Sequence, residues 1–314
     1  MTRRPDSIVV IDCHYKAPQR AAAYLIREPQ RAAFVDNNTV RAVPRLLDAL
    51  SRAGLAPADV EYLIVTHVHL DHAGGTAALL EHCPNATVLA HPKAARHLAA
   101  PERLVAGAKA VYGEETFARL YGEIRPVPEA RIRVIQDNEE IRWGGRCLRF
   151  LHTLGHATHH MCIHDSGSNG VFTGDAFGLG LNEAVRPGPS FFVATTAPTD
   201  FDPDEARKTV RRIVETGADW ACLAHFSVHA DLAGGAEKLL HSIDQMEDIL
   251  QDAAGVPDAD LEAYCQERMH AATEEQLRRC GVADLAHDLR WLHSDMDINA
   301  MGLAHVVRTR RTRS

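Results

Sequence analysis

Short apolar runs alternate with helical patterns between residues 7 and 224. Apolar residues spaced three or four apart predict helices at residues 40–53, 76–81, 92–99, 103–123 and 203–216. Runs rich in Val, Ile, Leu and Phe predict strands at residues 7–12, 23–27, 32–36, 62–65, 87–90, 132–135, 147–151, 160–164, 171–173 and 220–224. Two glycines, Gly107 and Gly113, are expected to break the helix at 103–123. Short strands with helices between them indicate a mixed α/β fold rather than a regular doubly wound one.

The pattern changes at Ala233, after which only helical periodicity remains. A first stripe comprises Leu239, Leu240, Ile243, Met246, Ile249 and Leu250. Leu261 and Tyr264 belong to a second predicted helix. The capping-box spacing of Thr273–Gln276 predicts the start of a third. Leu285, Leu289 and Leu292 continue the helical periodicity towards the end of the chain. We therefore expect an α/β domain at residues 1–231 and a helical extension at 232–314. The extension is expected either to close over a pocket or to join two copies of the chain.

The segment Ala176–Asp202 has few periodic features and is interrupted by glycine and proline, so it is predicted to be an irregular connection. It carries Phe177, Phe191 and Phe192, which indicates packing over a substrate or over the core; the pattern does not separate the two.

Composition narrows the class of protein. The chain has 314 residues, 46% of them hydrophobic and 24% charged, which is typical of a soluble globular protein. A net charge of −8 argues against nucleic acid as the main partner, and the basic end Arg308–Arg313 is expected to be a frayed, solvated terminus. Seven dispersed cysteines without a C-x-x-C pair suggest a reducing compartment. Because no apolar run resembles a signal peptide or a membrane span, we expect a cytoplasmic protein without a membrane partner.

The densest chemical signal is Thr66-His67-Val68-His69-Leu70-Asp71-His72, which follows the buried strand predicted at 62–65. Imidazole and carboxylate groups are ligands for divalent zinc or iron. His67 and His69 share a side at an offset of two residues, whereas Asp71 and His72 can diverge. One turn could therefore serve two metal ions.

Three further candidates lie at predicted strand ends: His156, Asp175 and His225. The first two directly follow a glycine, which allows close approach of the backbone. Taken singly, such residues are more often loop, turn or surface residues than ligands.

Taken together, these residues resemble the metallo-β-lactamase fold superfamily, in its glyoxalase II and thioesterase-like branch with a helical C-terminal extension. The H-x-H-x-D-H signature, the glycine-histidine, the Gly-Asp and the last histidine occur in the same order, over roughly residues 8–230. The resemblance implies an αββα four-layer sandwich of two mixed β-sheets with outer helices. It also implies that one metal is held by His67, His69 and His156, the other by Asp71, His72 and His225, with Asp175 bridging them.

The resemblance extends to the surroundings of the metals. Asp36 is expected to orient a ligand histidine, and His160 matches a common family position beyond the metals, whereas His159 is expected to face solvent. The family usually has Gly-His-Gly at the last ligand, and here Phe226 follows His225, which is expected to alter the pocket wall. Five other histidines are assigned no role in the site: His14, His91, His152, His164 and His229.

The chemistry implied is hydrolysis of a small-molecule thioester, lactone or related ester by a metal-bridging hydroxide, with Asp71 orienting the nucleophile and moving its proton. Two divalent ions are expected, zinc in the first place and iron or manganese as alternatives. A β-lactam is not favoured as substrate, because a bridging Gly-Asp aspartate is typical of other branches.

Other functions stay open at this point. One is a mononuclear iron persulfide dioxygenase. A diiron oxidoreductase is weaker, because such proteins commonly have glutamate at the position of His69. The last is a non-enzymatic regulator that is stabilised by metal and binds a partner through its helical extension.

Overall fold

The computed structural model describes residues 6–181, 188–197 and 200–313. The chain forms two compact units. The first comprises Met1–His152, His159–Gly174 and Gly217–Ala230, and the second comprises Thr153–Thr158, Asp175–Thr216 and Asp231–Ser314. This grouping does not test the boundary at residue 231, which stays a prediction.

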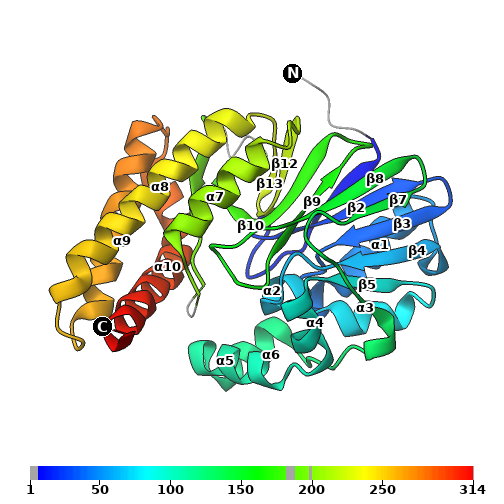
Figure 1. The fold of residues 1–314 in the computed structure, drawn as a ribbon, viewed down its shortest axis with the longest axis horizontal. Helices are drawn as coiled ribbons and strands as arrows, with labels where there is room; N and C mark the ends of the chain where they lie inside the picture. Colours follow the sequence, from blue (N-terminus) through cyan, green and yellow to red (C-terminus); the bar gives the residue numbers. More distant parts are fainter. Residues whose placement is uncertain (1–5, 182–187, 198–199, 314) are drawn as a thin grey trace. The chain divides into compact units, whose positions relative to one another are not determined.

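The first unit contains a six-stranded sheet with the strand order β1-β2-β3-β4-β5-β6 (Figure 1). Its strands are β1 (Ile8–Asp12), β2 (Ala22–Glu28), β3 (Arg31–Val35), β4 (Val60–Ile64), β5 (Thr87–Ala90) and β6 (Ile132–Val134). The pairs β1/β2 and β2/β3 are antiparallel, and β3/β4, β4/β5 and β5/β6 are parallel. The sheet is therefore mixed, as the alternating strand and helix patterns predicted.

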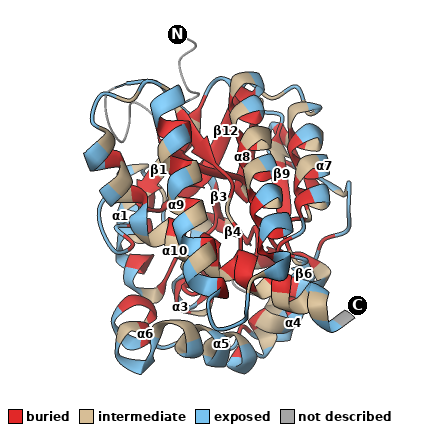
Figure 2. Ribbon diagram, turned by 90° about the vertical axis from the view of Figure 1, so that its left-hand side faces the viewer, coloured by how far each residue is buried: buried red, intermediate tan, exposed pale blue. Residues whose placement is uncertain are grey.

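Helices cover one face of this sheet through a continuous apolar core. The helices that contribute to that core are α1 (Val43–Arg52), α3 (Thr76–His82) and α4 (Pro92–Ala99). In α1, Pro44 lies in the first turn, where its missing N–H is tolerated, and Leu46 and Leu50 are fully buried. In Figure 2 the strands β3 and β4 are largely buried, whereas α1, α3 and α4 each carry both buried and exposed residues. Burial of one helical stripe is what holds these helices in place.

A second sheet has the order β13-β12-β10-β9-β8-β7, and apart from residues 175–181 of β10 this path belongs to the first unit. Its strands are β7 (Glu140–Trp143), β8 (Arg146–His152), β9 (Met161–Asp165), β10 (Gly170–Leu181), β12 (Trp220–His225) and β13 (Ser227–His229). Tyr24 of β2 joins the sheets: its ring lies 5.3 Å from that of Phe172, and its hydroxyl donates to the Leu223 carbonyl at 2.5 Å. The predicted α/β class with two mixed sheets and helices is confirmed.

The remaining helices of the first unit are α2 (Leu70–Ala73), α5 (Glu102–Tyr112) and α6 (Glu114–Tyr121), with short 3-10 turns at Val40–Ala42, Pro57–Asp59 and Glu129–Arg131. The predicted break at Gly113 is confirmed. The break at Gly107 is wrong, because a single glycine costs a helix only about 1 kcal/mol and good helix formers flank it.

The second unit consists of the end of β10, the strand β11 and a set of helices. β11 (Phe191–Val193) pairs antiparallel with residues 179–181 of β10. The helices are α7 (Pro203–Val214), α8 (Leu232–Asp252), α9 (Leu261–Arg279) and α10 (Leu285–Arg313), with a 3-10 turn at Ala253–Gly255. The predicted stripe on α8 is buried at Leu239, Ile243, Met246, Ile249 and Leu250. This stripe holds α8 in the unit, and the extension is helical as expected.

The segment 176–202 is more regular than predicted. β10 continues to Leu181, and β11 pairs with it. Gly178 makes this possible: its φ is +71°, and a Cβ there would lie 2.3 Å from the Val193 carbonyl oxygen. Of the predicted connection, residues 182–187, including Pro187, and 198–199 lie outside the described residues.

Two predictions for the extension are wrong. Thr273 does not start a helix, because it is buried inside α9, where tertiary packing overrides the local capping pattern. The basic end is not frayed, because α10 continues to Arg313. Arg308 pairs there with Asp258 and Glu262 at 2.9 Å, and these side chains remain partly exposed, so the end is helical but still solvated.

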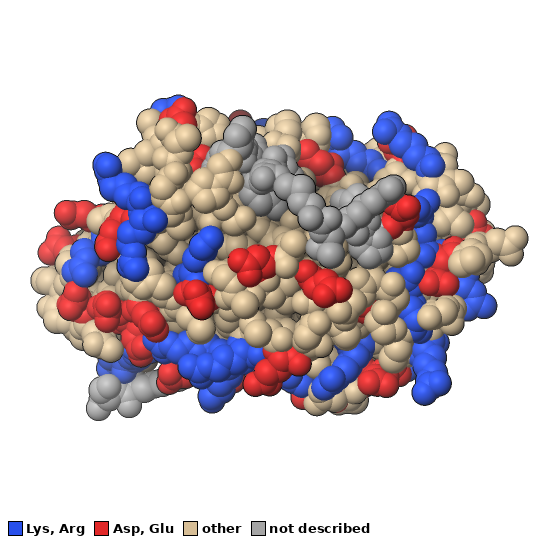
Figure 3. All heavy atoms as spheres, turned by 90° about the horizontal axis from the view of Figure 1, so that it is seen from above, with Lys and Arg blue, Asp and Glu red and all other residues tan. Residues whose placement is uncertain are grey.

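Within the part of the chain that the structure describes, no helix has both the length and the apolar character needed to cross a bilayer. On the face drawn in Figure 3, basic and acidic side chains are interspersed. That the protein does not bind nucleic acid stays a prediction.

Candidate metal centre

The histidine-rich turn connects the end of β4 to the short helix α2. Its backbone is fixed from a neighbouring loop, because Asn37 and Asn38 donate their N–H groups to the His72 carbonyl at 2.9 and 3.0 Å. A Cβ on Gly75 would lie 2.9 Å from the Asn37 and Thr39 carbonyl oxygens, so only glycine allows the two loops to meet. The side chains that follow β4 are therefore held on a rigid turn.

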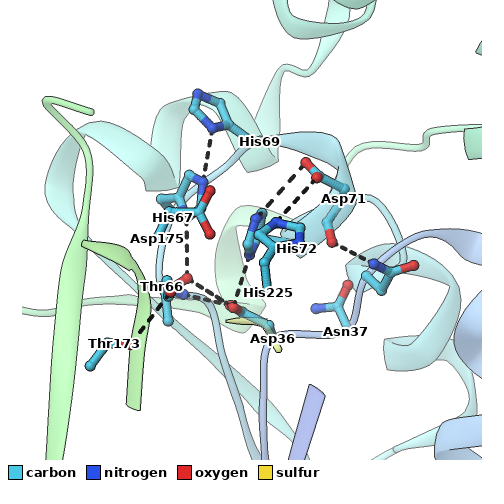
Figure 4. Close-up of polar contacts among 12 residues, drawn as sticks. Asp36, Asn37, Thr66, His67, His69, Asp71, His72, Thr173, Asp175 and His225 are labelled. Carbon is cyan, nitrogen blue, oxygen red and sulfur yellow. Dashed lines mark hydrogen bonds and ion pairs between the residues drawn. The ribbon is translucent and has the colours of Figure 1, made fainter. Parts of the chain in front are cut away.

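Asp71, His72 and His225 come together within the first unit (Figure 4). The His225 Nε2 lies 3.6 Å from Asp71 Oδ2, and the His72 Nε2 lies 4.0 Å from Asp71 Oδ1. The ligand atoms of the three residues all lie within 4.8 Å of one another. The structure thus brings together the three ligands predicted for one of the two metals, across more than 150 residues of sequence between His72 and His225.

The other nitrogen of each ring is held by the protein. His72 Nδ1 lies 3.1 Å from Asp36 Oδ2, and His225 Nδ1 lies 2.9 Å from the Arg20 carbonyl oxygen. Asp36 also accepts hydrogen bonds from the N–H and the hydroxyl of Thr66. In metal sites the ring N–H remote from the ion is commonly bound in this way to a carboxylate or a carbonyl. The three residues therefore fit a divalent ion.

His67 and His69 form a second pair on the same turn. His67 Nε2 lies 2.9 Å from His69 Nδ1, and His67 Nδ1 lies 3.2 Å from the Thr66 hydroxyl oxygen. Two imidazole lone pairs repel each other at this distance unless a proton or a cation lies between them. The pair is thus suited to binding a cation.

His156 and Asp175 lie together in the second unit. His156 Nε2 is 3.4 Å from Asp175 Oδ2, and both residues are buried. His156 Nδ1 lies 3.2 Å from the Thr195 carbonyl oxygen and 3.1 Å from its hydroxyl. Gly155 has φ +116°, and a Cβ on it would lie 2.5 Å from the Ala206 backbone, which explains the glycine before the histidine.

Two adjacent histidines complete the surroundings of His67. His160 is buried, and its ring lies 4.9 Å from that of His67. The prediction that His159 faces solvent is wrong, because its ring is stacked on His67 at 6.1 Å and also lies beside His97 at 6.0 Å. No sequence pattern distinguished His159 from its neighbours, since its contacts are with His67 and with His97 of α4, which are distant in the sequence.

Tyr15 and Tyr121 also belong to this region and were missed by the sequence analysis. Their hydroxyls share a hydrogen bond of 2.7 Å. Burial, and after it the negative charge of Asp71, raises the pKa of both phenols above its usual value. They therefore stay protonated and are neutral hydrogen-bonding groups. No signal could have found them, because Tyr15 lies in an irregular loop.

The four phenylalanines predicted to line a pocket, Phe177, Phe191, Phe192 and Phe226, are all buried. Phe177 and Phe192 pack edge to face at 5.8 Å within the second unit. Their role in a substrate pocket stays a prediction.

The sequence model of the metallo-beta-lactamase superfamily matches residues 17–225 of the chain. This chain belongs to the metallo-beta-lactamase superfamily. The match includes every predicted metal ligand from His67 to His225. The predicted family is thereby confirmed.

Individual relatives are distant. A hydroxyacylglutathione hydrolase from Aeromonas salmonicida is 28% identical over 153 residues, covering 48% of this chain and 44% of that protein. An acyl-coenzyme A thioesterase from Gallus gallus is 31% identical over 180 residues, covering 51% and 59%. The chain thus spans about half the length of the curated relatives it matches. The structure of a metallo-beta-lactamase family protein from Thermus thermophilus superposes with a TM-score of 0.65 at 22% identity, over 98% of this chain and 95% of that one, which shows the shared fold.

Proposed function

We propose that this protein is a metal-dependent hydrolase that cleaves a thioester or a related ester with water. The observation that carries the proposal is the geometry of the Asp71, His72 and His225 group. The Nε2 atoms of both histidines approach the Asp71 carboxylate, whereas their Nδ1 atoms contact Asp36 and the Arg20 carbonyl. Two of the distant relatives are named for thioester hydrolysis, which favours a thioester over the lactone or other ester that the sequence also allowed.

The proposal includes two metal ions. The first would be held by His67, His69 and His156, the second by the Asp71, His72 and His225 group, with Asp175 shared. Divalent ions bound to such ligands lower the pKa of a water molecule and polarise a carbonyl oxygen. Zinc is the ion we expect, because it accepts histidine and carboxylate together, and iron and manganese are the alternatives.

The residues of the chain have separate tasks in this scheme. Asp71 is 23% exposed at its side chain, so its carboxylate can meet solvent water, orient it and accept its proton. Addition of water to the carbonyl carbon and loss of the sulfur give a carboxylate and a thiol, and the proton received at Asp71 leaves to solvent. Asp36 and the Arg20 carbonyl keep the two imidazoles oriented throughout.

The test combines elemental analysis with a panel of thioesters, lactones and phosphodiesters. We expect about two metal ions per chain at the ligands between His67 and His225, and the highest kcat/KM on a thioester. One iron per chain, together with oxygen uptake on glutathione persulfide and no hydrolysis, would instead identify a dioxygenase. A protein that binds metal but turns over no substrate in either assay would indicate a regulator.

A single substitution tests the bridging role. Asp175→Asn removes one negative charge from the shared position and is expected to lose metal and hydrolytic turnover while the fold is retained, as judged by circular dichroism. Full activity with normal metal content would refute the bridging assignment.

A further inference from the structure

A third group of histidine and aspartate side chains lies on the C-terminal helices and is not part of the family ligand set. It comprises His270 on α9 and His293 and Asp297 on α10, all within the second unit. The ligand atoms of the three residues lie within 4.8 Å of one another. The proposed hydrolysis does not use any of them.

Helical spacing places these side chains opposite each other. His293 and Asp297 are four residues apart and so share one face of α10, as Gln266 and His270 do on α9. The two helices pack along each other (Figure 1). Each helix thus contributes one imidazole, and α10 adds the carboxylate between them.

The distances match the spacing of donor atoms around a small ion. His270 Nε2 lies 2.9 Å from Asp297 Oδ1, and His293 Nδ1 lies 3.1 Å from Asp297 Oδ2. In a tetrahedral zinc site with ligand bonds of about 2.0–2.1 Å, neighbouring donor atoms are separated by about 3.3 Å. The two nitrogen atoms lie within 4.8 Å of each other, so side-chain rotations that turn both nitrogens from the carboxylate towards a common point would place all three ligands around one ion.

The Asp297 carboxylate is held in a position from which it can bind a metal ion. Partial burial raises the pKa of Asp297, but hydrogen bonds from His270 and Gln266 outweigh this, so the pKa lies below its usual value. Gln266 Nε2 donates to Asp297 Oδ1 at 2.7 Å, which fixes the carboxylate as outer partners fix metal ligands. The side chains are 29% exposed at His270, 64% at His293 and 34% at Asp297, so an ion and a completing water can reach them.

We propose that His270, His293 and Asp297 form a separate binding site for a first-row divalent ion of the zinc class, which fastens α9 to α10. Two imidazoles and one carboxylate suit zinc, nickel or copper, whereas magnesium and calcium require oxygen ligands. Binding of the ion would replace the hydrogen bonds between the two imidazoles and Asp297 with bonds from the same ring nitrogens to the metal.

The probe is zinc alone, added to the purified full chain and followed by equilibrium dialysis with elemental analysis. His270→Ala and His293→Ala are each expected to bind one zinc fewer per chain than the wild type. The zinc-dependent rise in Tm should also be smaller in both variants, because the ion no longer links the two helices. The same loss of one zinc is expected on an Asp71→Ala, His225→Ala background, which makes the result independent of the proposed hydrolytic centre.

His287→Ala is the matched control. His287 is a half-exposed histidine of α10 that lies 3.2 Å from the Asp288 carboxylate, and within the described residues it belongs to no group of three ligand side chains. This variant should bind as much zinc as the wild type. The proposal is overturned if His270→Ala and His293→Ala retain the full zinc content and Tm shift, or if His287→Ala loses as much as they do. In the former case the group is only a hydrogen-bonded bridge between the helices.

Discussion

Each histidine of the Asp71, His72 and His225 group has one ring nitrogen bound by the fold and the other near Asp71. This arrangement selects which nitrogen can bind a metal, because a nitrogen that donates its proton to Asp36 or to a carbonyl is not a ligand. The orienting groups are therefore as necessary to the candidate centre as the ligands themselves.

Asp36→Asn is expected to lower metal affinity by about 10–100-fold, the usual effect of losing an outer partner of a ligand histidine. The amide cannot offer two acceptor oxygens to Thr66 and His72 at once. The backbone should not change, because Asp36 has φ +56° and asparagine tolerates this conformation. Competition dialysis against a chelator measures the effect.

Asp12→Asn is the control for this substitution, since Asp12 accepts hydrogen bonds from the N–H groups of His14 and Gln19 and pairs with the His14 imidazole in the loop after β1, and none of these partners is a predicted ligand. It should retain metal. Unchanged affinity in Asp36→Asn would show that His72 is held without the carboxylate.

His91 contributes to the pH dependence of stability. Burial, and after it the positive charges of His152 and Lys93, lowers its pKa from 6.5 to about 4. Between these values the unfolded chain binds a proton at His91 that the folded chain does not, so stability is lost as the pH falls from about 6.5 towards 4.

His91→Asn is expected to make the free energy of unfolding less dependent on pH in this window, by about 1–3 kcal/mol in total. Asparagine can still accept the Lys93 N–H that caps α4. Urea unfolding at several pH values measures the change. His82→Asn on the exposed side of α3 is the control variant, and an equal flattening there would contradict the role of His91.

At the scale of elements, α10 holds the segment that orients His156. The Asn299 side chain accepts the Thr196 N–H at 2.8 Å and donates to the Ala194 carbonyl at 3.0 Å. Thr195, between these two residues, lies against His156 Nδ1 through its carbonyl and hydroxyl oxygens. The extension thus contacts both neighbours of Thr195, and Thr195 contacts the predicted ligand His156, all within one unit.

Asn299→Ala is expected to lower the free energy of unfolding by about 2–4 kcal/mol, because it leaves a buried N–H and a buried carbonyl without partners. Metal affinity should fall as well, since Thr195 is no longer held in place. Thermal unfolding and dialysis measure the two effects.

The exposed amide of Asn85, which donates to the Ala58 carbonyl, provides the comparison. Asn85→Ala should cost less than about 1 kcal/mol and leave metal binding unchanged. If Asn299→Ala is equally mild, α10 does not control the position of His156.

At the scale of the whole molecule, the extension completes the second unit rather than only following the first. Gly235 of α8 is packed so closely on Phe177 and Phe192 that a Cβ there would lie 2.9 Å from the Phe192 ring. Gln276 of α9 donates to the Phe192 carbonyl at 2.7 Å. Removal of the helices would therefore expose large apolar side chains.

Truncation after Asp231 is expected to give a protein that aggregates or has a strongly lowered Tm, because this surface then meets solvent. We also propose that the extension covers the substrate pocket or joins two copies of the chain. Size-exclusion chromatography and kinetic assays of the truncated protein, compared with the full chain, test the expected instability and both proposed roles of the extension. A soluble monomer with unchanged kinetics on every substrate would contradict all of them.

The sequence by itself determined the family, the α/β class and the candidate ligands. These features were readable because the ligands lie at the ends of apolar strands: His67 closely follows β4, and His225 ends β12. Local periodicity predicts the strands and where they end, so the order of the motifs along the chain was sufficient to predict the family and the ligands.

Only the tertiary structure decided what surrounds those ligands. The carbonyl that orients His225 belongs to Arg20, which lies 205 residues earlier, and His159 became a neighbour of His67 through the position of α4. Similarly, His270 and Asp297 meet because two helices pack along each other. Hydrogen-bond direction and helix packing depend on residues distant in the chain, and no local pattern records them.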